Sequence, residues 1–513
     1  MKSEAVKELD LRSTSAPLRR GEDFLKAIAG DGRKVFVDGE LVKDVTTHAA
    51  FREGARSIAR LYDIAADPAN RERMTFASPD DGQPVLRAYQ IPKTREDMKA
   101  RRLAAETWAE ATCGLMGRTP DHVAGFFCGY AAKPQVFAKG GAEFGENVTR
   151  FYRHLRDNHL YASYAIVPPQ VDRSKAAHQQ HDATLHAGAY RETDGGIIVS
   201  GAQQLATGGV YSDWLYLSCI HPLKEGEEAQ AIGVAIPMNA PGLKLYARRA
   251  FAAKDRGSFD YPLTSRFDET DCLVVLNDVF VPWENVFIYR NREVCFDQWW
   301  QTPAHLYGNH QAQVRYATKL RFLMGLAKRM NQMTGHDKTP PVLVQMGELA
   351  SHASIVENMM LVQEAVAETD EDGVLWPSRT ALYSVMALQS QINPKMIDIV
   401  REITGAAMIT LPSSVRDFDN PEIAADLERF LGSPNHTARE KTELMKLAWD
   451  FIGTEFGNRH QQYEKFYGGA SHLVKMNVYR NYDFDRACGL VDAVLALPEI
   501  PLDPATDASA LPA

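Results

Sequence analysis

The chain has 513 residues, with 57 Lys and Arg against 66 Asp and Glu, so its formal charge is −9. This mild acidity excludes a protein that holds nucleic acid or anionic lipid by charge alone. The length is enough for several domains and a large core. The six cysteines are scattered without a CxxC pair, which is typical of reduced thiols and excludes a structural zinc site.

The first twenty residues mix both charge signs and contain no apolar block, so we do not expect a secretory signal. The chain also lacks a run of about 18 apolar residues, the length that a membrane-spanning helix needs. We therefore expect a cytoplasmic protein.

Residues 1–160 are predicted to form a helical N-terminal domain. In the segment 94–117 the apolar residues recur at helical spacing, and Thr94 with Asp97 has the spacing of a capped helix start. A second helix is predicted over 144–166, where the same period continues with charges between the apolar positions.

Residues 161–290 are predicted to form a central β domain. Short β-branched runs recur there with Gly, Asp and Pro between them, which favours an antiparallel sheet or a small barrel. Five such runs are GGIIVSG, WLYLSCI, AIGVAIPM, LKLYARRAF and DCLVVLNDVFVP.

Residues 291–485 are predicted to form a helical bundle. Four long amphipathic segments, 310–330, 343–368, 378–405 and 439–466, supply its helices. The remaining stretch, 486–513, is expected to be a tail that is disordered at its end, because it is rich in Pro, Ala and Asp. The fold class is thus mainly α with a central β domain.

None of the common cofactor and hydrolase signatures is present. The glycines of GGAEFG at 140–145 follow a loop and lack the GxGxxG spacing of a Rossmann site, and the chain has no GxxxxGK[ST], HExxH or GxSxG motif. A flavin would have to be held by another scaffold.

The loop GLMGRTPDHVAG places Arg118 just beyond a helix end and His122 just after a Thr-Pro-Asp turn. An arginine fork suits a carboxylate or phenolate oxygen, and loop tips often carry functional side chains. The alternative is that Arg118 pairs with a carboxylate of the protein and His122 caps a helix.

Two further segments could line a ligand. Two prolines stiffen the connection before Gln170 and Arg173, and Thr207 precedes two glycines that permit close approach of a planar ring. The alternatives are a plain interdomain connector for the first segment and a plain hairpin for the second.

Three positions in the bundle are also candidates. His310 opens a bundle helix, where a lone histidine is more often structural than catalytic. Ser413 in ITLPSS and Gly468 in FYGGASH lie in stretches of small residues, which suit either helix contacts or a ligand.

Several motifs together resemble the 4-hydroxyphenylacetate 3-monooxygenase family, oxygenase component. They are YQIPKTREDMKARR, WAEATCGLMGRTPDH, YAIVPPQVDRSK, TSRFDETDCLVVLNDVFVPWENVFIY and ITLPSS. The resemblance runs from about residue 21 to 485. It implies an acyl-CoA dehydrogenase-like fold, with an N-terminal α domain, a middle β-barrel and a C-terminal four-helix bundle, assembled as a homotetramer.

The resemblance also implies a reaction. A separate NAD(P)H:flavin reductase delivers FADH2, O2 forms a C4a-hydroperoxide on the flavin, and a phenol is hydroxylated ortho to its hydroxyl. It implies phenol contacts at Arg118, His122 and Tyr164, although this chain has His where the family usually has Tyr, and Tyr where it usually has His.

The resemblance further implies roles in the bundle and at the flavin. His310 is the candidate general base, and metal ligands are not expected. Flavin contacts are implied at Gln170, Arg173, Thr207, Ser413 and Gly468.

The exchange of His and Tyr leaves the substrate open between a 4-hydroxyphenylacetate-like phenol, a halophenol and a heteroaromatic or amino-aromatic acid such as pyrrole-2-carboxylate. In the last case Arg118 would hold the carboxylate.

Three other classes are weighed against this reading. A 4-hydroxybutyryl-CoA dehydratase of the same fold needs three cysteines and a histidine for an iron–sulfur cluster, and that set is incomplete near Cys113, Cys295 and His310. An acyl-CoA dehydrogenase needs a glutamate base in the bundle. A flavin-free oligomeric binding protein is the non-enzyme alternative.

Overall fold

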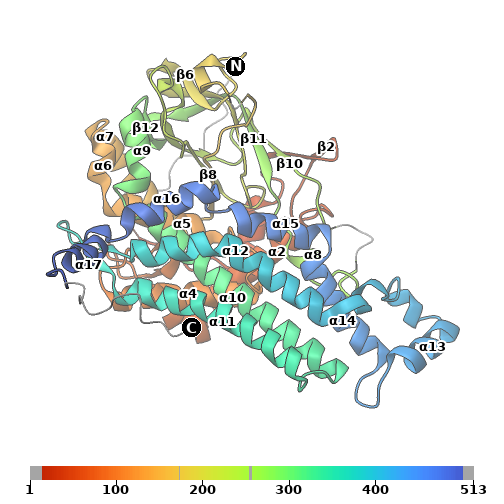
Figure 1. Cartoon of the computed structure of the whole chain (residues 1–513). Coiled ribbons are helices and arrows are strands. Elements are labelled where there is room, and N and C mark those ends of the chain that lie inside the picture. The colour runs from red at the N-terminus through yellow and green to blue at the C-terminus, as the bar shows by residue number, and fades with distance from the viewer. Residues whose placement is uncertain (1–13, 173, 253–256, 501–513) are drawn as a thin grey trace.

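The computed structural model describes residues 14–172, 174–252 and 257–500. Helices dominate the N-terminal part, with the central strands stacked on one side of the long bundle helices (Figure 1). The N-terminal helices are α1 (Gly21–Ile28), α2 (Arg52–Ala66), α3 (Arg71–Met74), α4 (Arg95–Ala111), α5 (Pro120–Ala132), α6 (Pro134–Ala138) and α7 (Ala142–Asp157).

The capped helix predicted after Thr94 is confirmed as α4. The Asp97 amide donates to Thr94 Oγ1 at 3.1 Å, and the Thr94 amide donates back to the Asp97 carboxylate at 3.0 Å. The second prediction was partly wrong, because α7 ends at Asp157 and the rest of the predicted helix contains a strand, β5 (Ala162–Ala165).

The strands form two main sheets and two short two-stranded ladders. The six-stranded sheet has the order β2-β1-β10-β11-β7-β6, and the four-stranded sheet has the order β12-β9-β8-β5. Besides β5, the strands are β1 (Lys34–Val37), β2 (Glu40–Val42), β3 (Thr75–Ala77), β4 (Pro84–Leu86), β6 (Gly188–Thr193), β7 (Gly196–Gln203), β8 (Trp214–Ser218), β9 (Ile232–Pro237), β10 (Leu243–Ala247), β11 (Cys272–Pro282), β12 (Val286–Tyr289), β13 (Glu368–Thr369) and β14 (Leu375–Trp376).

All five predicted β-branched runs are strands, which confirms the central β region. The larger sheet also recruits two strands from the helical N-terminal part. Strand β1 pairs in parallel with β10, with Lys34 opposite Lys244, and β2 pairs with β1. These strands are only three or four residues long, too short for alternation to reveal them.

The C-terminal part is the predicted bundle of long helices, which run side by side beneath the sheets (Figure 1). Its helices are α10 (Ala304–Thr334), α11 (Pro340–Ala365), α12 (Arg379–Thr404), α13 (Pro421–Leu431), α14 (Ala438–Ile452), α15 (Glu455–Phe466), α16 (Ser471–Asn481) and α17 (Phe484–Leu495). Two shorter helices, α8 (Thr264–Phe267) and α9 (Arg292–Trp300), precede it.

The last predicted bundle helix is in fact two helices. It is interrupted after Ile452, and the Thr454 side chain accepts from the Gly457 amide at 3.2 Å to start α15. The break matters for the site described below, because α15 can turn a different face toward the N-terminal helices.

The predicted tail begins as helix, since α17 covers its first residues. The end of the predicted tail, 501–513, lies outside the described residues. In the described part of the chain, no helix combines the length and apolar character needed to span a bilayer.

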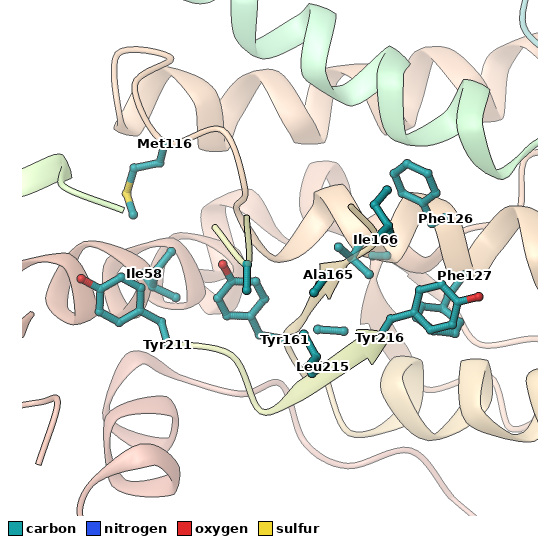
Figure 2. Packing of buried hydrophobic residues seen from close by; sticks show 14 of the residues in the cluster. Ile58, Met116, Phe126, Phe127, Tyr161, Ala165, Ile166, Tyr211, Leu215 and Tyr216 are labelled. Carbon is teal, nitrogen blue, oxygen red and sulfur yellow. The ribbon is translucent and has the colours of Figure 1, made fainter. Parts of the chain in front are cut away.

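Aromatic side chains fill the junction between the smaller sheet and α5. Figure 2 shows Tyr216 beside Phe127 of α5, with Phe126 of the same helix nearby and Tyr161 farther away, toward Tyr211. The Phe127 and Tyr216 ring centroids are 5.3 Å apart in an edge-to-face arrangement, and all of these side chains are buried. This packing fixes α5 against the sheet.

Helices α5 and α10 approach each other closely at Gly129. A Cβ atom there would lie 2.2 Å from the backbone nitrogen of Ala304, which cannot swing away as a side chain can. We expect Gly129→Ala to lower the free energy of unfolding by about 1–3 kcal/mol, measured by urea denaturation. Gly325→Ala on α10 is the control, because its Cβ would meet no atom within 4 Å and should stabilise slightly. Equal effects of the two substitutions would contradict this close approach.

Candidate active site

Three of the predicted site residues meet where α5, β5 and the end of α15 come together. The Arg118 guanidinium lies over the Tyr164 ring, 5.5 Å from its centroid. The Nε2 atom of His122 is 3.5 Å from the Tyr164 hydroxyl oxygen. The structure therefore brings Arg118, His122 and Tyr164 into one cluster, which we call the phenol triad.

The start of α5 positions two members of this triad. Thr119 is the N-cap and Pro120 the first helical residue, an arrangement that suits the fixed φ of proline. His122 follows in the first turn, and all residues from Pro120 to Tyr130 are buried. Because this helix is surrounded by protein on every side, its first turn cannot shift without disturbing the core.

The Arg118 side chain is held by an aromatic partner. Its Nη1 donates to the hydroxyl oxygen of Tyr463 on α15, and its guanidinium lies 5.2 Å from the centroid of that ring. Arg315 and Arg459 lie over the same ring, at 5.2 and 4.9 Å. Three guanidinium groups thus surround Tyr463, and each is attracted to the electron-rich face of its ring by a cation–π interaction.

The backbone around Arg118 is also fixed. The amides of Gly117 and Arg118 donate to Glu269 Oε2 at 2.7 and 3.0 Å, and Tyr161 donates its hydroxyl to the Arg118 carbonyl. Glu269 is therefore a protein carboxylate next to Arg118, as the alternative interpretation of the sequence required. It accepts from the backbone amides of Gly117 and Arg118, however, and leaves the Arg118 guanidinium for other contacts.

The charges of the triad are set by its surroundings. Burial alone would lower the pKa of Arg118, but the oxygens of Tyr164, Tyr463 and Glu269 outweigh it and raise the pKa above its ordinary value. Burial and the nearby Arg118 charge lower the pKa of His122 well below its ordinary value. At neutral pH the triad therefore holds one cation and one neutral imidazole.

Thr207 lies beside the same cluster. The next residue, Gly208, has a φ of +72°, and a Cβ on it would meet the Tyr161 hydroxyl at 2.3 Å. Thr207 donates its hydroxyl to Asp271 at 2.6 Å, and Asp271 also accepts from Arg459. The hydroxyl oxygen of Thr207 keeps its lone pairs as acceptors.

Gln170 lies on an exposed loop close to the Thr207 segment. The chain before it forms an isolated bridge in which the Gln204 amide donates to the Val167 carbonyl at 2.7 Å. Both loops leave this bridge, one toward Gln170 and the other toward Thr207. Arg173, predicted beside Gln170, lies outside the described residues.

His310 is not part of the phenol triad. Its Nε2 lies 3.3 Å from Glu364 Oε1 on α11, and Glu364 also accepts from Arg102 at 2.6 Å. His310 and Asp121 line a small cavity of about 20 Å³ between α4, α5 and α10. The described structure therefore places His310 beside the Glu364 carboxylate and outside the triad.

Ser413 and Gly468 are placed elsewhere in the bundle. Ser413 precedes α13, is exposed, and bonds to Asp417 through its hydroxyl at 2.9 Å. Gly468 follows α15, and a Cβ there would meet Met386 on α12 at 2.7 Å. The contact at Gly468 is the helix contact that small residues permit, one of the two readings that the sequence left open.

Three residues that contact the triad or its backbone, and a fourth behind them, were not predicted from the sequence. Tyr463 binds Arg118, Gln311 Oε1 lies 3.0 Å from His122 Nδ1, and Glu269 and Arg459 form an ion pair at 2.7 Å behind the loop. Gln311 could have been suspected from the sequence, because it directly follows the candidate residue His310. Tyr463 and Glu269 show no local signal, because their neighbours come from distant segments.

Within the described residues, no group of three or more His, Cys, Asp or Glu side chains is arranged to hold a metal ion. Cys113 and Cys295 are free thiols, and Cys295 donates to the Cys219 carbonyl at 3.5 Å.

Sequence models of the 4-hydroxyphenylacetate 3-hydroxylase N-terminal and C-terminal domains match residues 20–288 and 295–496. The chain belongs to the 4-hydroxyphenylacetate 3-hydroxylase family. The earlier resemblance is therefore confirmed, and so is the fold class that it implied.

Two relatives within the family illustrate its range. The oxygenase component of 4-hydroxyphenylacetate 3-monooxygenase from Pseudomonas aeruginosa is 34% identical, over 93% of this chain and 91% of its own length. The oxygenase component of 4-nitrophenol 2-monooxygenase from a Rhodococcus species is 32% identical, over 90% of this chain and 88% of its own.

A solved structure shows the same fold. The oxygenase component of 4-hydroxyphenylacetate 3-monooxygenase, complexed with FAD and 4-hydroxyphenylacetate, superimposes with a TM-score of 0.88 at 34% identity. The match covers 93% of this chain and 98% of that chain. Both relatives, and the protein in this solved structure, are named as oxygenase components of 4-hydroxyphenylacetate or 4-nitrophenol monooxygenases.

Proposed function

We propose that this protein is the oxygenase component of a two-component, FADH2-dependent monooxygenase that hydroxylates a small phenol ortho to its hydroxyl group. The observation that carries this proposal is the phenol triad, in which a fixed guanidinium and a neutral imidazole both lie against the Tyr164 phenol. Together with membership of the 4-hydroxyphenylacetate 3-hydroxylase family, this supports an aromatic monooxygenase.

The loops of Gln170 and Thr207 fit a flavin ring beside the triad. Leu205 and Val171, their neighbours, are 55% and 47% exposed, so two apolar side chains lie uncovered where a planar ring would be expected to stack. Thr207 offers a hydroxyl oxygen that accepts from a ring N–H. The flavin contacts implied at Arg173, Ser413 and Gly468 stay predictions.

The reduced cofactor supplies two electrons and, with O2, one electrophilic oxygen atom. One oxygen atom enters the ring, the other leaves as water, and the flavin is released oxidised, so a separate NAD(P)H:flavin reductase must reduce it again.

The chain's own residues prepare the ring for attack. Arg118 is held by Tyr463 and places its positive charge where a phenolate oxygen would lie, which favours loss of the phenol proton. Tyr164 offers a hydroxyl to the same oxygen. His122 is neutral and accepts the proton, so in this proposal it takes the base role that the resemblance assigned to His310.

The substrate class follows from this arrangement. Arg118 supplies the one cation that a phenolate oxygen needs, and the similar proteins named above support a 4-hydroxyphenylacetate-like phenol as the first choice and a halophenol as the second. A heteroaromatic acid such as pyrrole-2-carboxylate is the alternative, because the same guanidinium fits a carboxylate.

The experiment is an aerobic turnover assay with a generic flavin reductase, NADH and FAD. We would offer 4-hydroxyphenylacetate, 4-nitrophenol, chlorophenols, anthranilate and pyrrole-2-carboxylate, and detect the added oxygen by mass spectrometry. An ortho-hydroxylated phenol is the expected product. Oxygen added only to an acid without a hydroxyl would make Arg118 a carboxylate clamp, and failure to bind reduced FAD would favour the flavin-free binding protein.

We further propose a homotetramer. Helices α16 and α17 carry exposed large apolar side chains along their described length, including Leu473, Tyr479, Leu490, Val494 and Leu495. Large apolar side chains exposed on neighbouring helices support a surface that other copies of the chain cover. Light scattering should report four chains, and a monomer would contradict the proposal.

A cytoplasmic location stays a prediction.

A further inference from the structure

The imidazole of His122 has two nitrogens, and only one of them faces Tyr164, another member of the phenol triad. Nε2 points to the Tyr164 hydroxyl, whereas Nδ1 lies 3.0 Å from Gln311 Oε1 on α10. A neutral imidazole donates from one nitrogen and accepts at the other. Which nitrogen carries the proton therefore decides whether the side facing the triad can take a proton.

The amide of Gln311 is oriented by two neighbours on the other side. Its Nε2 lies 3.1 Å from Asp121 Oδ1 and 3.2 Å from Thr119 Oγ1. Thr119 gives its own hydroxyl hydrogen to the same Asp121 oxygen, at 2.5 Å, so the Thr119 oxygen can only accept from Gln311. Both contacts therefore require the NH2 end of the amide, and the carbonyl end must face His122.

We propose that Gln311, oriented by Asp121 and Thr119, is a positioning residue that holds His122 in the tautomer protonated on Nδ1. Nε2 is then an unprotonated acceptor facing Tyr164 and the bound phenol. The inference rests on the proposed function for its catalytic consequence. The proton leaves the phenol oxygen for His122 Nε2, which gives a phenolate and an imidazolium without any redox step.

The charged and titratable neighbours of His122 agree with this arrangement. Besides Arg118 from the loop before α5, they are Arg315 and His305 from α10 and Tyr164 from β5. None of these groups accepts a hydrogen from Nδ1, so the carbonyl of Gln311 is the acceptor that the described residues provide. Burial with Arg118 keeps the ring neutral before substrate arrives.

Asp121 can perform its part in either protonation state. Burial raises the pKa of Asp121 to about 6, and its Oδ2 is buried without a hydrogen-bond partner among the described residues. Asp121 also lines the 20 Å³ cavity with His310, a volume that suits one water molecule. A proton on Oδ2 would leave Oδ1 as the acceptor for Gln311, so the orientation of the amide survives titration.

The test reads the tautomer directly. Protein labelled with 15N-histidine, without flavin or substrate, is measured by magic-angle-spinning NMR, and His122 is assigned by the signals lost in His122→Phe. We expect a protonated Nδ1 and an unprotonated Nε2 in the wild type. In Gln311→Leu, Nδ1 loses its acceptor, and we expect the proton to move to Nε2. Asp121→Asn should give a mixture, because an amide at 121 accepts or donates.

Gln313→Leu is the matched control. Gln313 is a buried amide on the same helix that binds the Leu382 carbonyl and Gln363, so its loss perturbs the bundle without touching His122. We expect the wild-type tautomer there. A wild-type His122 protonated on Nε2, or the same signals in wild type and Gln311→Leu, would overturn the inference.

Turnover supplies the second readout. Gln311→Leu should lower coupled hydroxylation by about 100-fold, the usual size of a lost acid–base contribution, and change its pH profile more than its KM. If no phenol is hydroxylated by the wild type, the proposed function fails while the tautomer result stands. If turnover is normal in Gln311→Leu, the inference fails while the proposed function stands.

Discussion

Replacing Arg118 by alanine is expected to lower coupled hydroxylation by about 100-fold or more, the cost of removing one charged donor aimed at a developing oxyanion. Reduced flavin should still react with O2, so NADH consumption continues and hydrogen peroxide replaces the hydroxylated product. The measurement is the ratio of product to NADH oxidised, with peroxide quantified in the same reaction.

Two controls make that result specific. Arg56→Ala removes an exposed arginine on α2 and should leave the coupling ratio unchanged. Arg118→Lys keeps the charge but loses the planar fork that reaches Tyr463, and should give intermediate coupling. Product formation by Arg118→Ala at the wild-type ratio would remove Arg118 from the site.

The largest expected effect on stability is at Glu464. This carboxylate, on α15, accepts from Arg315 at 2.9 Å, from Lys319 at 2.9 Å and from Gln389, so it ties α10 and α12 to α15. All three charged side chains are buried. Glu464→Gln leaves two buried cations without their anion, and we expect a loss of about 3–5 kcal/mol in the free energy of unfolding by urea denaturation.

The pH dependence of this effect has a definite sign. Burial alone would raise the pKa of Glu464, but Arg315 and Lys319 outweigh it and lower the pKa to about 2. Because the folded pKa lies below the unfolded value of about 4.3, the stabilisation is complete above that value and is lost as the pH falls toward 2.

The difference in the free energy of unfolding between wild type and Glu464→Gln should therefore have its full size at pH 6 and be smaller at pH 3. Glu422→Gln, an exposed position on α13, is the control and should change little at either pH. A gap that is constant or grows on acidification would show that Glu464 acts by packing and not by charge.

The periodic parts of the fold could be predicted from the sequence. The capped start of α4 and the long bundle helices have patterns that need only their own residues, and so do the strands of the central β region. The break at Ile452 was missed because apolar spacing continues across it, and β1 was missed because its partner is supplied by β10.

The site could be predicted only where a motif carried it. Arg118, His122 and Tyr164 stand in segments that resemble the family, whereas Gln311 and Tyr463 are polar residues on long helices. On such helices a polar residue ordinarily faces solvent, and only the rotation of α10 and α15 in the packed bundle turns these two toward α5. That rotation depends on helix packing, which no local pattern records.

The pairing of β1 with β10 also has a consequence for synthesis on the ribosome. Lys34 emerges early, but its ladder partner Lys244 is translated about 200 residues later, a delay of roughly 10–40 s at about 5–20 residues per second. Throughout that interval the hairpin of β1 and β2 has an unpaired edge, which is the kind of surface that nascent-chain chaperones cover. The hairpin can therefore complete its pairing only after β10 has left the exit tunnel, and a fragment ending before β10 would keep that edge open permanently.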